Sequence, residues 1–134
     1  MRFDLTVNEF TKELSLKRKL VVYGEQFWRP YCHVLDIAIA VILIIQAPDN
    51  KVAFEVFNVG NSDENYTKKM LVDEISKFIS NAEIEYVHKD EDPRDYKVNF
   101  NKIRSTLDFN TKMDVKAGIR QVKQAVEQGL IKNP

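Results

Sequence analysis

The amino-acid sequence predicts a single α/β domain over residues 1–134, on three observations. The chain is long enough for one domain with a substantial core, because a chain of about 150 residues buries roughly 70% of its unfolded surface. Hydrophobic residues make up 44% and charged residues 30%, which is typical of globular domains rather than disordered chains. Short runs rich in β-branched residues alternate with segments whose apolar residues recur at helical spacing.

The first third of the chain predicts a helix, a strand and an irregular segment. Apolar residues at helical spacing over 3–16 predict an amphipathic helix. The β-rich run over 20–23 predicts a strand that ends in a turn at Gly24. Residues 25–33 are rich in aromatic side chains, and Pro30 disfavours a helix there.

The most apolar stretch, over 34–47, predicts a helix that is interrupted only by Asp36 and Gln46. It is too short to cross a bilayer, which needs about 20 apolar residues. A helix that is apolar on all sides is expected to be buried on all sides, and the helix dipole favours Asp36 in the first turn. A turn at 48–50 should end this helix, and 53–60 predicts a strand.

The second half of the chain begins with a helix capped by Thr67 and ends with a helix capped by Asp114. Between them, the pattern predicts a strand over 84–87, a charged loop over 89–95, an edge-like strand over 96–100 and a small helix that starts within 103–107.

Charge and cysteine content exclude several kinds of function. Lys plus Arg equals Asp plus Glu at 20 each, so no global basic field exists for nucleic acid or an anionic membrane, and neither is an expected partner. A single cysteine, Cys32, forms no intrachain disulfide, and with only two histidines no structural zinc site of the usual kind is expected. The N-terminus has early acidic residues and no apolar signal region, so we expect a cytoplasmic location.

Common catalytic motifs are absent from the sequence. The four glycines, at 24, 60, 118 and 129, are too far apart for a phosphate-binding or dinucleotide-binding loop, and no Gly-x-Ser-x-Gly elbow occurs. Cys32 and His33 are adjacent on a segment expected to be extended, so their side chains should point to opposite faces. We therefore expect Cys32 to be a buried, inert thiol.

Two arginines differ from the general background of charge. Arg29 lies among aromatic residues on a stiff segment, which suits bidentate binding of phosphate, and Arg94 follows Pro93 in an acidic loop. The alternative for both is a purely structural role in a cation–π contact or a salt bridge, and Asp92 and Asp95 could simply neutralise Arg94. The nearby aromatic side chains could stack on a base or sugar, or pack in the core: Tyr23, Trp28 and Tyr31.

Four strings of residues carry a family resemblance: Leu-Val-Val-Tyr-Gly at 20–24, Trp-Arg-Pro-Tyr-Cys-His-Val-Leu-Asp-Ile-Ala at 28–38, Val-Phe-Asn-Val-Gly at 56–60, and Asp-Pro-Arg-Asp-Tyr at 92–96. In this order and spacing they resemble the NAD-dependent epimerase/dehydratase family, extended short-chain dehydrogenases/reductases that act mostly on nucleotide sugars. The resemblance covers only the C-terminal, substrate-binding part of that family. It implies a partial extended short-chain dehydrogenase fold of short strands and about four to five helices.

The hydride-transfer machinery of that family has no counterpart here. The dinucleotide-binding half is missing, with its glycine loop and its Tyr-x-x-x-Lys pair, since Tyr66 is followed by lysines at the second and third positions rather than the fourth. NAD or NADP is implied only for a complete enzyme, and this chain is expected to hold no cofactor and to be inactive by itself.

The resemblance also implies roles for six residues. Arg29 and Arg94 match a pair that clamps the substrate diphosphate. Val21 and Tyr23 match the strand that lines the base, Tyr31 matches an aromatic residue beside the diphosphate and sugar, and Asp4 stands where the family often has an asparagine that faces the substrate.

The resulting hypothesis is the substrate-binding portion of a nucleotide-sugar epimerase or dehydratase, which positions the nucleotide diphosphate. The alternative is a non-enzymatic module for nucleotide-sugar binding or oligomerisation. Because the apolar helix and strand should be uncovered in this chain, we expect a homo-oligomer or a separate dinucleotide-binding chain as partner. The expected interface includes Ile39, Ile42, Leu43 or Phe57.

Overall fold

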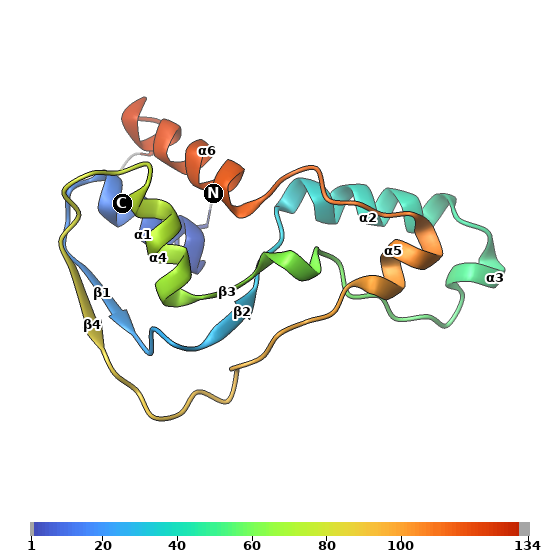
Figure 1. The fold of residues 1–134 in the computed structure, drawn as a ribbon. Coiled ribbons are helices and arrows are strands. Elements are labelled where there is room, and N and C mark those ends of the chain that lie inside the picture. The colour runs from blue at the N-terminus through green and yellow to red at the C-terminus, as the bar shows by residue number, and fades with distance from the viewer. Residues whose placement is uncertain (1, 132–134) are drawn as a thin grey trace.

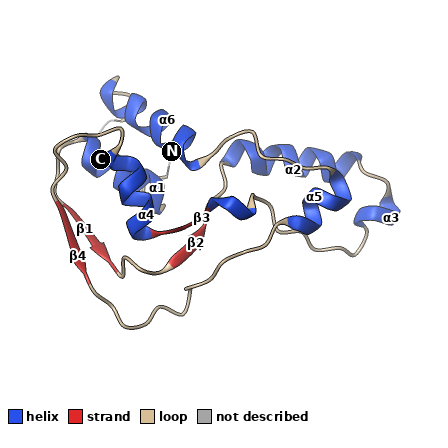
Figure 2. Cartoon of the chain, viewed as in Figure 1, coloured by secondary structure: helices blue, strands red, loops and turns tan. Residues whose placement is uncertain are grey.

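Six α-helices and four short strands make up the fold in a computed structural model, which describes residues 2–131 (Figures 1 and 2). In chain order the elements are α1 (Thr6–Ser15), β1 (Leu20–Tyr23), β2 (Trp28–Pro30), α2 (Val34–Gln46), α3 (Asp49–Val52), the 3₁₀ turn η1 (Ser62–Glu64), β3 (Asn65–Thr67), α4 (Lys68–Ser76), β4 (Ile84–Val87), α5 (Asn101–Leu107) and α6 (Val115–Glu127).

The strands form two separate two-stranded sheets. β1 pairs in parallel with β4, with Leu20 opposite Ile84. β2 pairs antiparallel with β3, with Arg29 opposite Tyr66. Both pairings join segments that are far apart in the sequence, so the sheets hold the chain together rather than forming local hairpins.

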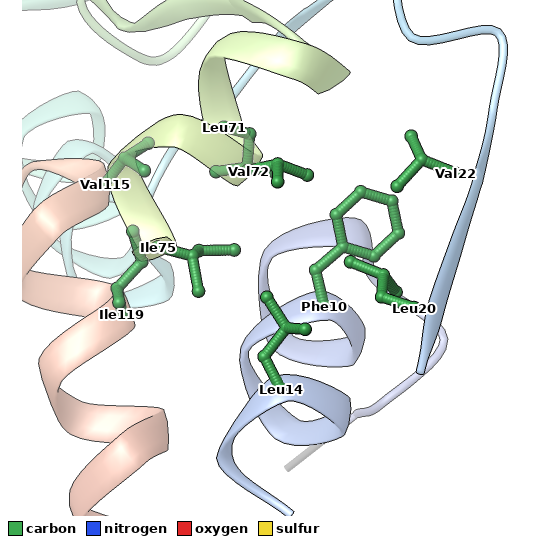
Figure 3. Close-up of a cluster of buried hydrophobic side chains, with 9 residues drawn as sticks. All are labelled: Phe10, Leu14, Leu20, Val22, Leu71, Val72, Ile75, Val115 and Ile119. Atoms are coloured by element: carbon green, nitrogen blue, oxygen red, sulfur yellow. The ribbon is translucent and has the colours of Figure 1, made fainter. Parts of the chain in front are cut away.

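A first hydrophobic core lies where α1, α4 and α6 pack against β1 (Figure 3). The helices at the two ends of the chain lie side by side in this core (Figure 1). Nine buried side chains form it: Phe10, Leu14, Leu20, Val22, Leu71, Val72, Ile75, Val115 and Ile119. Two of the helices begin as expected, because Thr67 accepts a hydrogen bond from the Met70 N–H and Asp114 accepts one from the Ala117 N–H.

A second, smaller core lies between α2 and α5. Its buried members are Ala40, Phe100, Ile103 and Phe109, and half-buried side chains, including those of Phe57 and Val59, pack against them. The two cores are separate clusters, so specific polar contacts must fix their relative position.

Asp36 provides such a contact. Its side chain is fully buried in the first turn of α2, where the sequence places it. One carboxylate oxygen accepts a hydrogen bond from the Lys112 N–H at 2.7 Å, and the other accepts one from the Met113 N–H at 3.1 Å. The carboxylate therefore does more than complement the helix dipole, because it ties α2 to the segment that leads into α6.

Two predicted strands are wrong. Residues 53–59 form no strand, and among the described residues the main chain of Val56–Val59 makes no hydrogen bond to another main-chain group, because no strand lies beside it. Residues 96–100 also form no strand. The side chain of Asn65 instead binds both the N–H and the carbonyl of Val98, and Ser62 Oγ accepts a hydrogen bond from the Phe100 N–H.

The apolar circumference of α2 alone predicts burial on all sides, but the helix is partly uncovered, as expected for a chain without a dinucleotide-binding half. One face packs on the second core, whereas the opposite face exposes apolar side chains such as Val34 and Ile45, which are 73% and 77% exposed. Of the four predicted interface residues, Ile42 is exposed, but the other three pack against the second core: Ile39, Leu43 and Phe57. Within residues 2–131, no helix combines the length and apolarity that crossing a bilayer requires.

Candidate functional site

The β2–β3 ladder fixes the position of Arg29. Arg29 is the central residue of β2 and pairs with Tyr66, and the Tyr31 N–H continues the connection by donating to the Glu64 carbonyl at 2.9 Å. The extended geometry agrees with the bias that Pro30 imposes on the preceding residue. The local pattern predicts an irregular segment here, because a three-residue strand is defined by its distant partner rather than by its own residues.

The guanidinium of Arg29 is buried against the loop after β4, with only 15% of the side chain exposed. Nη2 donates to Asp92 Oδ2 at 2.6 Å, and Nη1 donates to the carbonyl oxygens of Trp28, at 2.7 Å, and of Arg94. The ring of Tyr96 lies 5.9 Å away from the guanidinium carbon. Nε–H and the second N–H of Nη2 have no partner among the described residues.

Asp92 organises the same loop around Arg94. Its Oδ1 accepts a hydrogen bond from the Arg94 N–H at 2.9 Å and lies 3.5 Å from Arg94 Nε. The Arg94 main-chain N–H, together with the Arg29 charge, lowers the pKa of the Asp92 carboxyl. The side chain of Arg94 is 77% exposed. The structure thus brings the two predicted arginines together around one carboxylate, with Arg29 anchored and Arg94 open to solvent.

Two lysines that the sequence analysis did not single out lie in the same region. Lys68 Nζ donates to the Tyr23 carbonyl oxygen at 2.6 Å. Burial lowers the pKa of Lys68, the charge of Asp92 opposes this effect, and the charges of Arg29, Arg94 and Lys89 add to it. Lys89 Nζ lies 5.4 Å from the centre of the Tyr23 ring. No sequence motif marks these lysines, because only the tertiary fold gathers them.

The four other predicted site residues are placed differently. Tyr23 is exposed at the end of β1, beside the lysines, and Val21 is half-buried in the same strand. Tyr31 packs edge-on against Tyr66 with ring centres 6.3 Å apart, and burial raises the pKa of its hydroxyl. Asp4 is exposed before α1 and forms an ion pair with Arg2 at 2.5 Å, so its recorded contacts do not connect it to the arginines.

Three other features were candidates for a functional site: the Cys32 thiol, a metal-binding cluster and a surface depression. Burial, and then the charge of Asp36, raise the pKa of Cys32 to about 11, so the half-buried thiol stays protonated at neutral pH. In the part of the chain that the structure describes, no cluster of three or more possible metal ligands is found. An open polar depression at the start of α6 is lined by residues that include Asp114, Arg120 and Gln121, and by none of the six predicted site residues.

Comparison with known proteins finds one family model and several solved structures that resemble this chain. The model of the NAD dependent epimerase/dehydratase family matches residues 5–60, which include Arg29. UDP-glucose 4-epimerase from Thermotoga maritima, solved with UDP-glucose, is 22% identical and has a TM-score of 0.79 over 95% of this chain and 40% of its own. UDP-glucuronic acid 4-epimerase from Bacillus cereus, solved with UDP-glucuronic acid and NAD, is 15% identical, with a TM-score of 0.80 over 96% and 41%.

A dehydratase shares the same fold. dTDP-glucose 4,6-dehydratase from Bacillus anthracis, solved with NAD, is 23% identical and has a TM-score of 0.76 over 96% of this chain and 40% of its own. The chain therefore spans about 40% of the length of these solved structures. The expected fold class, part of an extended short-chain dehydrogenase fold, is confirmed.

Proposed function

Because this chain resembles the NAD-dependent epimerase/dehydratase family and has the fold of part of such enzymes, we propose that it is their substrate-binding portion and positions a nucleotide diphosphate. One observation carries the proposal: Arg29 and Arg94, 65 residues apart, meet around Asp92. Arg29 is held by three hydrogen bonds and has two N–H groups without a partner among the described residues. Arg94 lies beside Asp92 but exposes most of its side chain, so it can reach a ligand from solvent. Paired guanidinium groups suit the oxygens of a diphosphate.

Local charge supports an anionic ligand. The whole chain has no net charge, yet four positive charges, those of Arg29, Lys68, Lys89 and Arg94, act in the region of Asp92. A second carboxylate, that of Asp95, lies in the same loop and accepts a hydrogen bond from the Trp28 N–H at 2.7 Å, so the cations outnumber these two carboxylates. A diphosphate would balance this excess. Holding the diphosphate fixes where the attached sugar lies, which is how a binding portion contributes to catalysis.

The residues present do not fit a dinucleotide cofactor. Gly24 follows β1, but no other glycine lies near it in the sequence, so no glycine-rich turn leads from a strand into a helix within the described residues. We therefore derive no hydride-transfer step from this chain, and we expect it to be inactive without a dinucleotide-binding part.

The uncovered surface supports a partner of that kind. The outer face of α2 exposes apolar side chains, and the neighbouring segment has exposed side chains at Phe54 and Val56. The Val56 carbonyl accepts a hydrogen bond from Lys102 Nζ at 2.8 Å, whereas the main chain of 57–59 has no hydrogen-bond partner among the described residues. Apolar exposure together with a segment that pairs with no strand among the described residues suits addition to another sheet. We infer that a dinucleotide-binding part, on a separate chain or elsewhere in a longer one, covers this surface. Self-association of a non-enzymatic binding module is the alternative.

Titration calorimetry of the chain with UDP-glucose and dTDP-glucose tests the binding function. We expect weak binding, and a loss of about tenfold in Arg94→Ala, because a charge-assisted contact contributes about 1.5–3 kcal/mol before ordering costs are subtracted. Arg29→Lys should also weaken binding, since lysine lacks the planar fork. The control is Arg104→Ala, an exposed arginine on α5. Absence of binding to the unaltered chain, or equal effects of Arg94→Ala and Arg104→Ala, would contradict the proposal.

A further inference from the structure

We propose that Lys68 is a third cationic contact to the bound anion and that it makes the site prefer a diphosphate over a monophosphate. This inference rests on the proposed function and adds to it a residue and a specificity. Lys68 comes from a third segment, the start of α4, whereas Arg29 lies on β2 and Arg94 lies in the loop after β4.

Two neighbouring elements fix the position of the Lys68 main chain. β3 ends at Thr67, which pairs with Trp28, the neighbour of Arg29 on β2. Thr67 also caps α4, and Leu71 and Val72 anchor that helix in the first core. The main chain of Lys68 is therefore held next to the ladder that carries Arg29.

The side chain of Lys68 lacks a carboxylate of its own. Its Nζ donates to the Tyr23 carbonyl, and within the described range no carboxylate oxygen lies within 4.0 Å of it. The next residue, Lys69, forms an ion pair with Asp73 at 3.8 Å and is exposed. A half-buried ammonium whose only recorded partner is a neutral carbonyl has two N–H donors left for a ligand, and burying a charge without a counter-ion is costly.

The electrostatics point the same way. The charges that act on Lys68 are one carboxylate, Asp92, and three cations, Arg29, Lys89 and Arg94, and its pKa lies below the ordinary value. An anion entering this region would relieve repulsion among the cations. One phosphate group can bind to the two guanidinium groups of Arg29 and Arg94. A second phosphate group can then bind to the ammonium of Lys68, which comes from a different element.

The test compares affinities for UMP and UDP in the full chain, measured by titration calorimetry. In Lys68→Gln we expect UDP to bind about tenfold more weakly and UMP less than about threefold more weakly, so the preference for UDP falls. Lys69→Gln, the matched control on the same turn, should change neither affinity. The salt dependence of UDP binding should also become shallower in Lys68→Gln, because one fewer cation takes part.

Other outcomes would overturn the inference. If Lys68→Gln weakens UMP and UDP equally, or changes neither, Lys68 does not contact the second phosphate. If Lys68→Gln does not fold, Lys68→Arg provides the test, since it keeps the charge and should keep the preference for UDP. Failure of the unaltered chain to bind UDP would instead refute the proposed function, and Arg94→Ala separates the two cases.

Discussion

Replacing Asp36 should separate the two hydrophobic cores and lower the free energy of unfolding. The carboxylate is fully buried and accepts hydrogen bonds from two main-chain N–H groups, those of Lys112 and Met113. A hydrogen bond to a charged group contributes about 1.5–3 kcal/mol, so Asp36→Ala should destabilise the chain by about 3 kcal/mol or more. Asp36→Asn keeps the shape but points an N–H₂ group at one donor, so we expect a loss of about 1.5–3 kcal/mol.

Urea denaturation followed by circular dichroism measures the loss, with Asp49→Ala as the control. Asp49 is exposed at the start of α3 and makes no side-chain contact of this kind, so its replacement should stay within about 0.5 kcal/mol of the unaltered chain. If Asp36→Asn unfolds at the same urea concentration as Asp49→Ala, the two hydrogen bonds do not hold the cores together.

The reactivity of the Cys32 thiol should also change in Asp36→Asn. Burial, followed by the charge of Asp36, raises the pKa of Cys32 to about 11. Asp36→Asn removes the second cause, so the pKa should fall but stay above the ordinary value, and alkylation at pH 9 should become faster because more thiolate is present. An unchanged alkylation rate in a folded Asp36→Asn chain would show that the charge of Asp36 does not reach Cys32.

Two glycine replacements should have opposite effects on the free energy of unfolding, measured by urea denaturation. In Gly60→Ala the new Cβ would lie 2.8 Å from the Phe100 ring, which should cost about 1–3 kcal/mol. In Gly118→Ala, within α6, the new Cβ would make an ordinary contact with His33 at 3.9 Å, and the higher helix propensity should stabilise the chain by up to about 1 kcal/mol. On the outer face of α2, Ile45→Lys should reduce self-association measured by light scattering, and an unchanged mass would exclude this face from the contact. Asp92→Asn should tighten UDP binding, because it removes the charge of the carboxylate that pairs with both arginines, and it should also lower the thermal midpoint. Weaker calorimetric binding in a folded variant would contradict this.

Elements with strong local signals could be predicted from the sequence. The caps at Thr67 and Asp114 and the apolar run of α2 are local features, and the structure has them where the pattern places them. The prediction of a strand over 53–60 is wrong because the pattern of residues can favour an extended chain but cannot show that a second strand lies beside it. β2 and β3 were missed for the converse reason, since three residues become a strand only through a partner more than 30 residues away.

The candidate site divides in the same way. Arg29 and Arg94 stood out through their neighbours in the sequence and through the family resemblance, and the structure brings them together. Lys68 and Lys89 are ordinary lysines in a chain that has many, so only the fold reveals that they share a region with the arginines. Asp4 shows the opposite case, because a loose positional match placed it in the site whereas its recorded contact is with Arg2.

The packing of the first helix on the last imposes an order on biosynthesis. About 100 residues separate the end of α1 from the start of α6. At about 5–20 residues per second, a ribosome completes α6 roughly 5–20 s after α1. Until Val115 and Ile119 are made, Phe10 and Leu14 on the nascent chain lack a main part of their apolar surroundings. The first core can therefore close only after α6 has been synthesised, and until then the apolar face of α1 lacks its partner helix.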